Sequence, residues 1–69
     1  MAITIQHVHA TEVKILYYGN RPDTIQQEIA GNMDDIAEHA AGVLVHHGFS
    51  NADVFDANTG EVLMIITRA

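Results

Sequence analysis

The chain contains no cysteine among its 69 residues. Disulfide bonds are therefore excluded, and so are metal sites built from thiolates. A chain of this length forms a single domain, residues 1–69, which buries only about 60% of the surface that its unfolded form exposes. Small domains usually gain stability from disulfides, a metal or a partner subunit. A metal held by histidine or carboxylate side chains, or oligomerisation, therefore remains as a source of support.

Basic residues are also scarce. Three Lys and Arg residues stand against nine Asp and Glu residues, which gives a formal net charge of -6. This balance opposes binding to a phosphate backbone or to anionic lipid, so we expect neither nucleic acid nor membrane as a partner. The acidic residues are spread along the chain, a pattern typical of a soluble surface, although a basic protein partner is an alternative.

The sequence has no long apolar run. No stretch approaches the ~20 apolar residues of a membrane-spanning helix. The N-terminus, MAITIQHVHATE, lacks the basic start and the continuous apolar core of a signal peptide. We therefore expect a cytoplasmic protein.

The clearest feature that is present is one amphipathic helix, predicted over about residues 33–47. Asn32 is placed to cap its first turn, and Gly48 can adopt the left-handed conformation that ends it. The residues that share the expected buried face are Met33, Ile36, Ala37, Ala40, Val43, Leu44 and His47.

The N-terminal third alternates between apolar and polar residues, which is typical of strands with one buried face. We expect the first core strand at residues 11–18. Residues 1–10 would then form either an edge strand or an arm exchanged with another subunit.

Residues 24–30 fit two structures. Ile25 and Ile29 would lie on one face of a strand, but they also extend the apolar face of the helix backwards. Gly31 breaks the segment and Asn32 begins a separate helix, so we favour a strand that forms a hairpin with residues 11–18.

A second hairpin is predicted from residues 52–56 and 61–67. Asp56 can accept hydrogen bonds from the amides of the turn, and Gly60 can supply a positive φ. The expected fold is therefore a two-layer α+β unit of order ββαββ, with one helix on an antiparallel or mixed four-stranded sheet.

The last strand contains the run VLMII, which is apolar on both faces. One helix covers only one face of a sheet, so the opposite face should need a partner. We expect a homodimer, with another protein partner as an alternative. The residues expected at this interface are Leu16, Tyr18, Phe55, Val62, Met64 and Ile66.

Five histidines are the one compositional oddity. His7 and His9 would leave the same face of an extended segment, which suits zinc or nickel if a third ligand is added. This metal-binding module is the alternative function, and no other cofactor is expected. On the helix, we expect His46 and His47 to complement the C-terminus and His39 to pair with an acidic residue one turn earlier, Asp35.

Support for catalysis is thin. Ser50 is the only serine and has no glycine elbow around it, while Asp34 and Asp35 diverge by ~100° on a helix. A small enzyme with a histidine as general base is therefore the third hypothesis. We expect a non-enzymatic scaffold, adaptor or inhibitor that acts through protein contacts.

Overall fold

The structure of the protein, a computed structural model, describes residues 2–3 and 11–68. Apart from Ala2 and Ile3, the N-terminal segment that we expect to be an edge strand or an exchanged arm lies outside the described residues. His7 and His9 lie outside them too.

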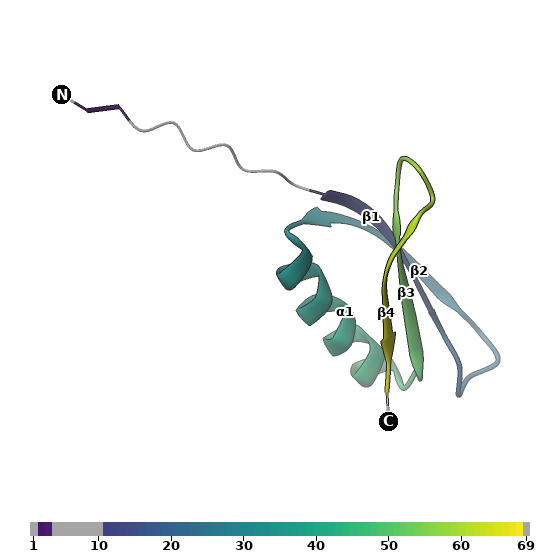
Figure 1. Cartoon of the computed structure of the whole chain (residues 1–69). Coiled ribbons are helices and arrows are strands. Elements are labelled where there is room, and N and C mark those ends of the chain that lie inside the picture. Colours follow the sequence, from purple (N-terminus) through teal and green to yellow (C-terminus); the bar gives the residue numbers. More distant parts are fainter. Residues whose placement is uncertain (1, 4–10, 69) are drawn as a thin grey trace.

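The described chain forms one helix on one face of a four-stranded sheet (Figure 1). The elements are β1 (Thr11–Tyr18), β2 (Ile25–Gly31), α1 (Met33–His47), β3 (Asn51–Asp56) and β4 (Val62–Thr67). The strand order is β2-β1-β3-β4, and every neighbouring pair is antiparallel. The predicted two-layer ββαββ fold is confirmed, and the sheet is purely antiparallel.

The segment 24–30 corresponds to a strand, as favoured, although β2 begins at Ile25 and includes Gly31. β2 pairs with β1 so that Ile25 lies opposite Tyr17 and Ile29 lies opposite Val13. Directly opposite residues share a face, so both isoleucines lie on the side that α1 covers. The hairpin is closed by a turn with positive φ at Gly19, where a Cβ would collide with the Ser50 side chain.

Both ends of α1 are capped as predicted. The Asn32 side chain accepts a hydrogen bond from the Asp35 amide at 2.9 Å and donates one to the Asp35 carboxylate at 2.8 Å. At the other end, Gly48 has a φ of 76°, and its amide reaches back to the last carbonyls. These contacts satisfy backbone groups that the helix itself leaves unpaired.

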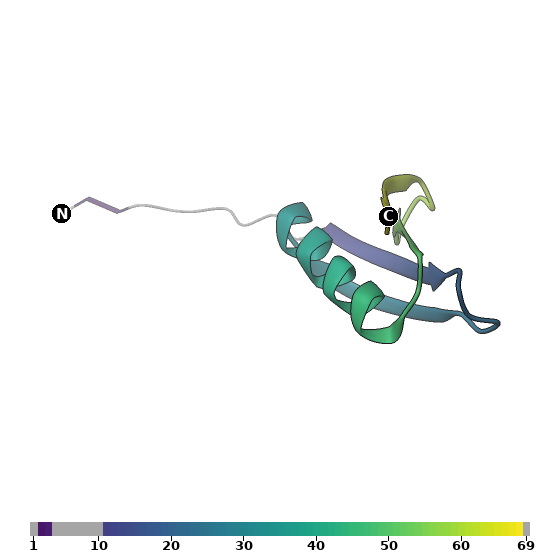
Figure 2. The same ribbon diagram turned by 90° about the horizontal axis from the view of Figure 1, so that it is seen from below.

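The core lies between α1 and the sheet (Figure 2). From α1, Ile36, Ala40 and Leu44 are buried at a spacing of four residues, which defines a narrow apolar stripe. The other buried core residues come from β1, from β3 and from the segment after the helix: Val13, Ile15, Tyr17, Phe49, Ala52 and Val54.

The prediction that His47 lies on the buried face of the helix is wrong, because His47 is exposed. The helix ends there, and the chain reverses at Gly48, so Phe49 reaches the core instead and is fully buried. Its ring centroid lies 6.2 Å from that of Tyr17.

Arg21 ties the β1–β2 turn to the end of α1. Its guanidinium lies 4.8 Å from the centroid of the Phe49 ring and donates to the His47 carbonyl at 2.8 Å. It also forms two hydrogen bonds to the Asp23 carboxylate, at 2.9 and 2.8 Å. Arginine can make all these contacts together because its planar donors are fixed in one fork.

The first prediction concerns the cap of α1. Asn32→Ala should lower the free energy of unfolding by about 1 kcal/mol, because two hydrogen bonds at the helix start are lost. Urea unfolding followed by circular dichroism measures this change. Asn58→Ala is the matched control, since Asn58 is exposed and only its backbone amide is hydrogen-bonded. Equal effects of the two substitutions would contradict the capping role.

Candidate functional site

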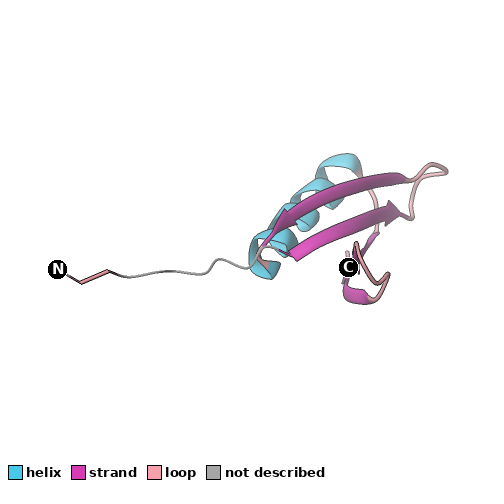
Figure 3. Cartoon of the chain, turned by 90° about the horizontal axis from the view of Figure 1, so that it is seen from above, coloured by secondary structure: helices cyan, strands magenta, loops and turns pink. Residues whose placement is uncertain are grey.

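The candidate site is the face of the sheet opposite α1, which we call the open face. Figure 3 shows α1 in cyan along one side of the magenta strands. The most exposed large apolar side chains of the sheet belong to β4, in which Val62, Leu63 and Ile65 are 49%, 37% and 64% exposed. Met64 and Ile66 are half-buried against the core. From Leu63 to Ile66, the side chains of β4 therefore alternate between an uncovered and a covered face.

This alternation corrects part of the predicted interface. The sequence predicts Met64 and Ile66 at the interface, but both lie opposite buried core residues, Val54 and Ala52, and face α1. Leu63 and Ile65 take the open-face positions instead. The sequence shows no alternation in this run, so it gave no means of choosing between the two sets.

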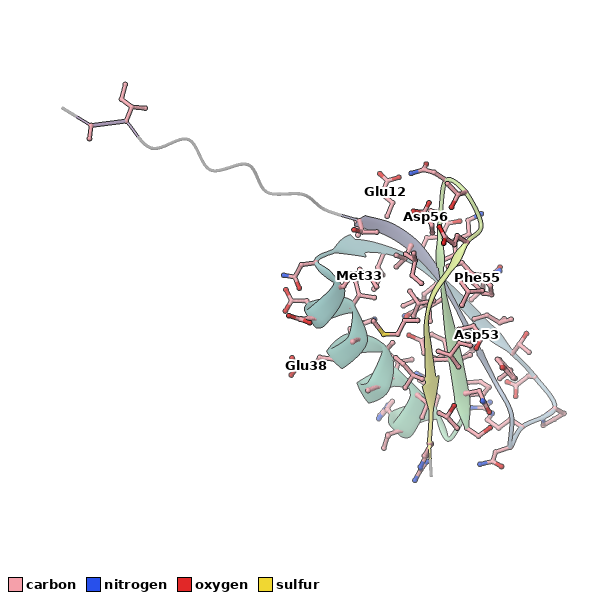
Figure 4. The ribbon with its side chains drawn as sticks, viewed as in Figure 1. Glu12, Met33, Glu38, Asp53, Phe55 and Asp56 are labelled. Carbon is pink, nitrogen blue, oxygen red and sulfur yellow. The ribbon has the colours of Figure 1, made fainter. Side chains whose placement is uncertain are left out.

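A bulge explains why Val62 nevertheless lies on the open face. Val54 pairs with Met64, but the next β3 residue, Phe55, pairs with Val62, so Leu63 is the extra residue. Figure 4 shows Phe55 on the side of the sheet away from α1, and its partner Val62 shares that face.

Strand β1 contributes the remaining apolar residues. Leu16 and Tyr18 alternate with the buried Ile15 and Tyr17, so they lie on the open face, where both are partly exposed. We call the whole set the open-face patch, whose residues are Leu16, Tyr18, Phe55, Val62, Leu63 and Ile65.

The patch has one acidic side chain near its centre. Asp53 lies opposite Leu16 on one side and opposite Ile65 on the other. The Tyr18 hydroxyl donates to the Asp53 carboxylate at 3.3 Å. Partial burial and the neighbouring negative charge raise the pKa of Tyr18 above its usual value of 10.0. Tyr18 therefore remains a neutral hydrogen-bond donor to Asp53 across the physiological range.

Asp56 fixes the turn that positions β4. Its carboxylate accepts hydrogen bonds from the backbone amides of Asn58 at 2.8 Å and Thr59 at 3.0 Å. Gly60 closes the turn with a φ of 75°. The two roles predicted for Asp56 and Gly60 are thus confirmed. The hydrogen bonds from Thr59 and Asn58 hold the pKa of Asp56 below its usual value of 3.8.

A second surface feature runs along one side of α1. It is an open groove of about 500 Å³ with Gly42 at its middle. The titratable side chains along it are Asp35, Glu38, His39, His46 and His47. It is a shallow surface rather than an enclosed site, and Gly42 has open space where a Cβ would be.

The expected pairing of His39 with Asp35 is replaced by another contact. The His39 ring nitrogen lies 3.2 Å from the Gln27 side-chain oxygen, which also accepts the Tyr17 hydroxyl at 2.7 Å. Asp35 is engaged by the cap Asn32 instead. The rings of His46 and His47 meet edge to face, 5.0 Å apart.

Nothing in residues 2–3 and 11–68 gathers three or more histidine or acidic side chains into a cluster that could hold a metal ion. The Ser50 hydroxyl donates to the Asn51 side-chain oxygen at 2.6 Å. The described residues contain no helix that is long and apolar enough to cross a membrane.

Comparison of the chain with protein-family models, with curated proteins and with solved structures gives no match.

The second prediction concerns Asp56 and acid. Because the folded-state pKa is lowered, the carboxylate stabilises the fold above its usual pKa, and this stabilisation is lost as the pH falls through the folded value. Asp56→Ala should therefore lower stability at neutral pH and flatten the acid side of the stability profile below about pH 4. Urea unfolding across the acid range measures both effects.

Asp56→Asn provides the matched control. It keeps a side-chain oxygen that can accept the amides of Asn58 and Thr59, but it does not titrate. It should retain part of the neutral-pH stability with the same flattened profile. An unchanged acid slope in both variants would show that other groups dominate acid unfolding.

Proposed function

We propose that the protein acts through protein–protein contacts made by the exposed apolar residues of β4, and that its partner there is a second copy of the same chain. The observation that carries the proposal is the exposure of Ile65, Val62 and Leu63 on a sheet face that α1 does not cover. Monomeric proteins seldom expose a contiguous apolar patch without a binding role. The proposed role is non-enzymatic, as a scaffold, adaptor or inhibitor.

A two-fold symmetric dimer suits this patch because it uses each exposed side chain twice. Burying a whole isoleucine or leucine side chain contributes about 2 kcal/mol, and roughly half of that is gained for a side chain that is already half-buried. The gain must exceed an association cost of at least about 4 kcal/mol. We therefore expect a reversible dimer whose population depends on protein concentration.

The metal-binding hypothesis stays a sequence prediction. Its two ligands, His7 and His9, lie outside the described residues, and no contact of the described part favours a metal.

The third prediction tests the patch with two charge substitutions. Ile65→Asp should weaken self-association at least tenfold, because it places two like charges opposite each other across the symmetry axis. Val45→Asp is the matched control: it adds the same charge at an apolar residue of α1 that is 56% exposed and lies outside the patch. It should leave the dimer intact.

Light scattering after gel filtration, over a range of concentrations, measures the mass of all three proteins. A wild-type chain that stays monomeric up to about 1 mM would overturn the homodimer. A dimer that Ile65→Asp and Val45→Asp weaken equally would place the interface elsewhere.

A further inference from the structure

We propose that two copies of the chain join edge to edge, with β4 of one pairing antiparallel to β4 of the other about a two-fold axis at Ile65. The result is one continuous eight-stranded sheet with both helices on the same face. This inference rests on the proposed function, because it specifies how the homodimer forms.

The edge formed by β4 lacks the usual protection against pairing. In the strand order, β4 and β2 are the two outer strands of the described sheet. Outer strands normally carry charges, prolines or bulges that prevent pairing with another chain. β2 carries the exposed Glu28, whereas VLMIIT of β4 has neither a charge nor a proline, and its bulge lies at its first residues.

The backbone N–H and C=O groups of Ile65 and Thr67 point outward from the β4 edge of the sheet. The Arg68 amide donates to the Ser50 carbonyl at 2.8 Å, so the backbone groups of Arg68 point toward β3. In an antiparallel ladder this direction alternates. The backbone N–H and C=O groups of Ile66 therefore point toward β3, while those of Ile65 and Thr67 point away from it.

At Ile65 the backbone and the side chain favour the same arrangement. A two-fold axis perpendicular to the sheet keeps each open face on the same side of the joined sheet. It places Ile65 opposite Ile65 of the second copy, and Leu63 opposite Thr67 of that copy. The most exposed apolar side chain of the sheet is then covered by its own symmetry mate.

The charges at the ends of β4 support an antiparallel pair. Each copy carries a formal charge of -6, which opposes self-association in general. However, the residues that border β4 are Glu61 at one end and Arg68 at the other, and both are exposed. Antiparallel pairing brings Glu61 of each copy near Arg68 of the other.

Asp53 disfavours the alternative in which two open faces stack on each other. Asp53 is paired with Leu16 on one neighbouring strand and with Ile65 on the other, and the one side-chain hydrogen bond of its carboxylate in the described structure comes from Tyr18. Stacking would remove this charge from water without a cationic partner, which is costly. Edge pairing leaves Asp53 exposed to water.

Amide hydrogen exchange of the full wild-type chain distinguishes these arrangements. Exchange is measured by NMR above and below the dissociation constant found by light scattering. The amides of Ile65 and Thr67 should exchange at least tenfold more slowly when the dimer is populated. The Met64 and Ile66 amides, already bonded within the sheet, provide the internal control and should change little.

Each other outcome has a distinct meaning. A dimer in which the Ile65 and Thr67 amides stay fast would overturn edge pairing but leave the proposed homodimer standing. Protection that is independent of concentration would mean that the edge is covered within one chain, and would also overturn it. A chain that never dimerises would remove the proposed function as well.

A cysteine variant provides a second measurement. Hydrogen-bonded antiparallel pairs have Cα atoms ~5.5 Å apart, within the range that a disulfide spans. The chain has no native cysteine, so oxidised Ile65→Cys should yield a covalent dimer much faster than the control Val45→Cys. Equal rates for the two variants would count against an axis at Ile65.

Discussion

A single helix can cover only one face of a sheet, and the other features of this molecule depend on that limit. The narrow stripe of Ile36, Ala40 and Leu44 packs against one face of the four-stranded sheet and closes the core there. β4, however, carries apolar residues on both faces. Met64 and Ile66 extend the covered core, while Leu63 and Ile65 stay exposed. The exposed apolar surface therefore follows from having one helix to cover a sheet whose strand β4 is apolar on both faces.

The position of that helix depends on contacts at its two ends. Asn32 caps the start immediately after β2, so the strand and the helix share a single junction residue. At the far end, Arg21 joins the β1–β2 turn to the His47 carbonyl and to the Phe49 ring. A short helix with few core residues gains much from such fixed ends, because helix formation in isolation is marginal at this length.

Local sequence signals predicted most of the fold, whereas contacts between residues distant in sequence could not be predicted from them. Asn32 and Gly48 act within one turn of the chain, so their roles could be read directly, and the same holds for Asp56 in its hairpin. Which β4 side chains lie on the open face depends on a bulge in the pairing with β3, where Phe55 pairs with Val62. The contact of His39 with Gln27 likewise joins elements that are distant in sequence. Such choices follow from register, which an uninterrupted apolar run leaves undetermined.

The two edges of the sheet differ in a way that would limit assembly to two copies. In the proposed dimer both β4 edges are consumed, and the outer strands of the joined sheet are the two copies of β2. Glu28 is exposed on β2 with its ion-pair partner Lys14 3.7 Å away on the neighbouring strand. A second β2 laid antiparallel here would add the charge of its own Glu28, and charged edge strands resist such pairing. In the proposed dimer, the uncharged β4 edge would supply the backbone groups for pairing, and the charged β2 edge would prevent further copies from adding to the sheet.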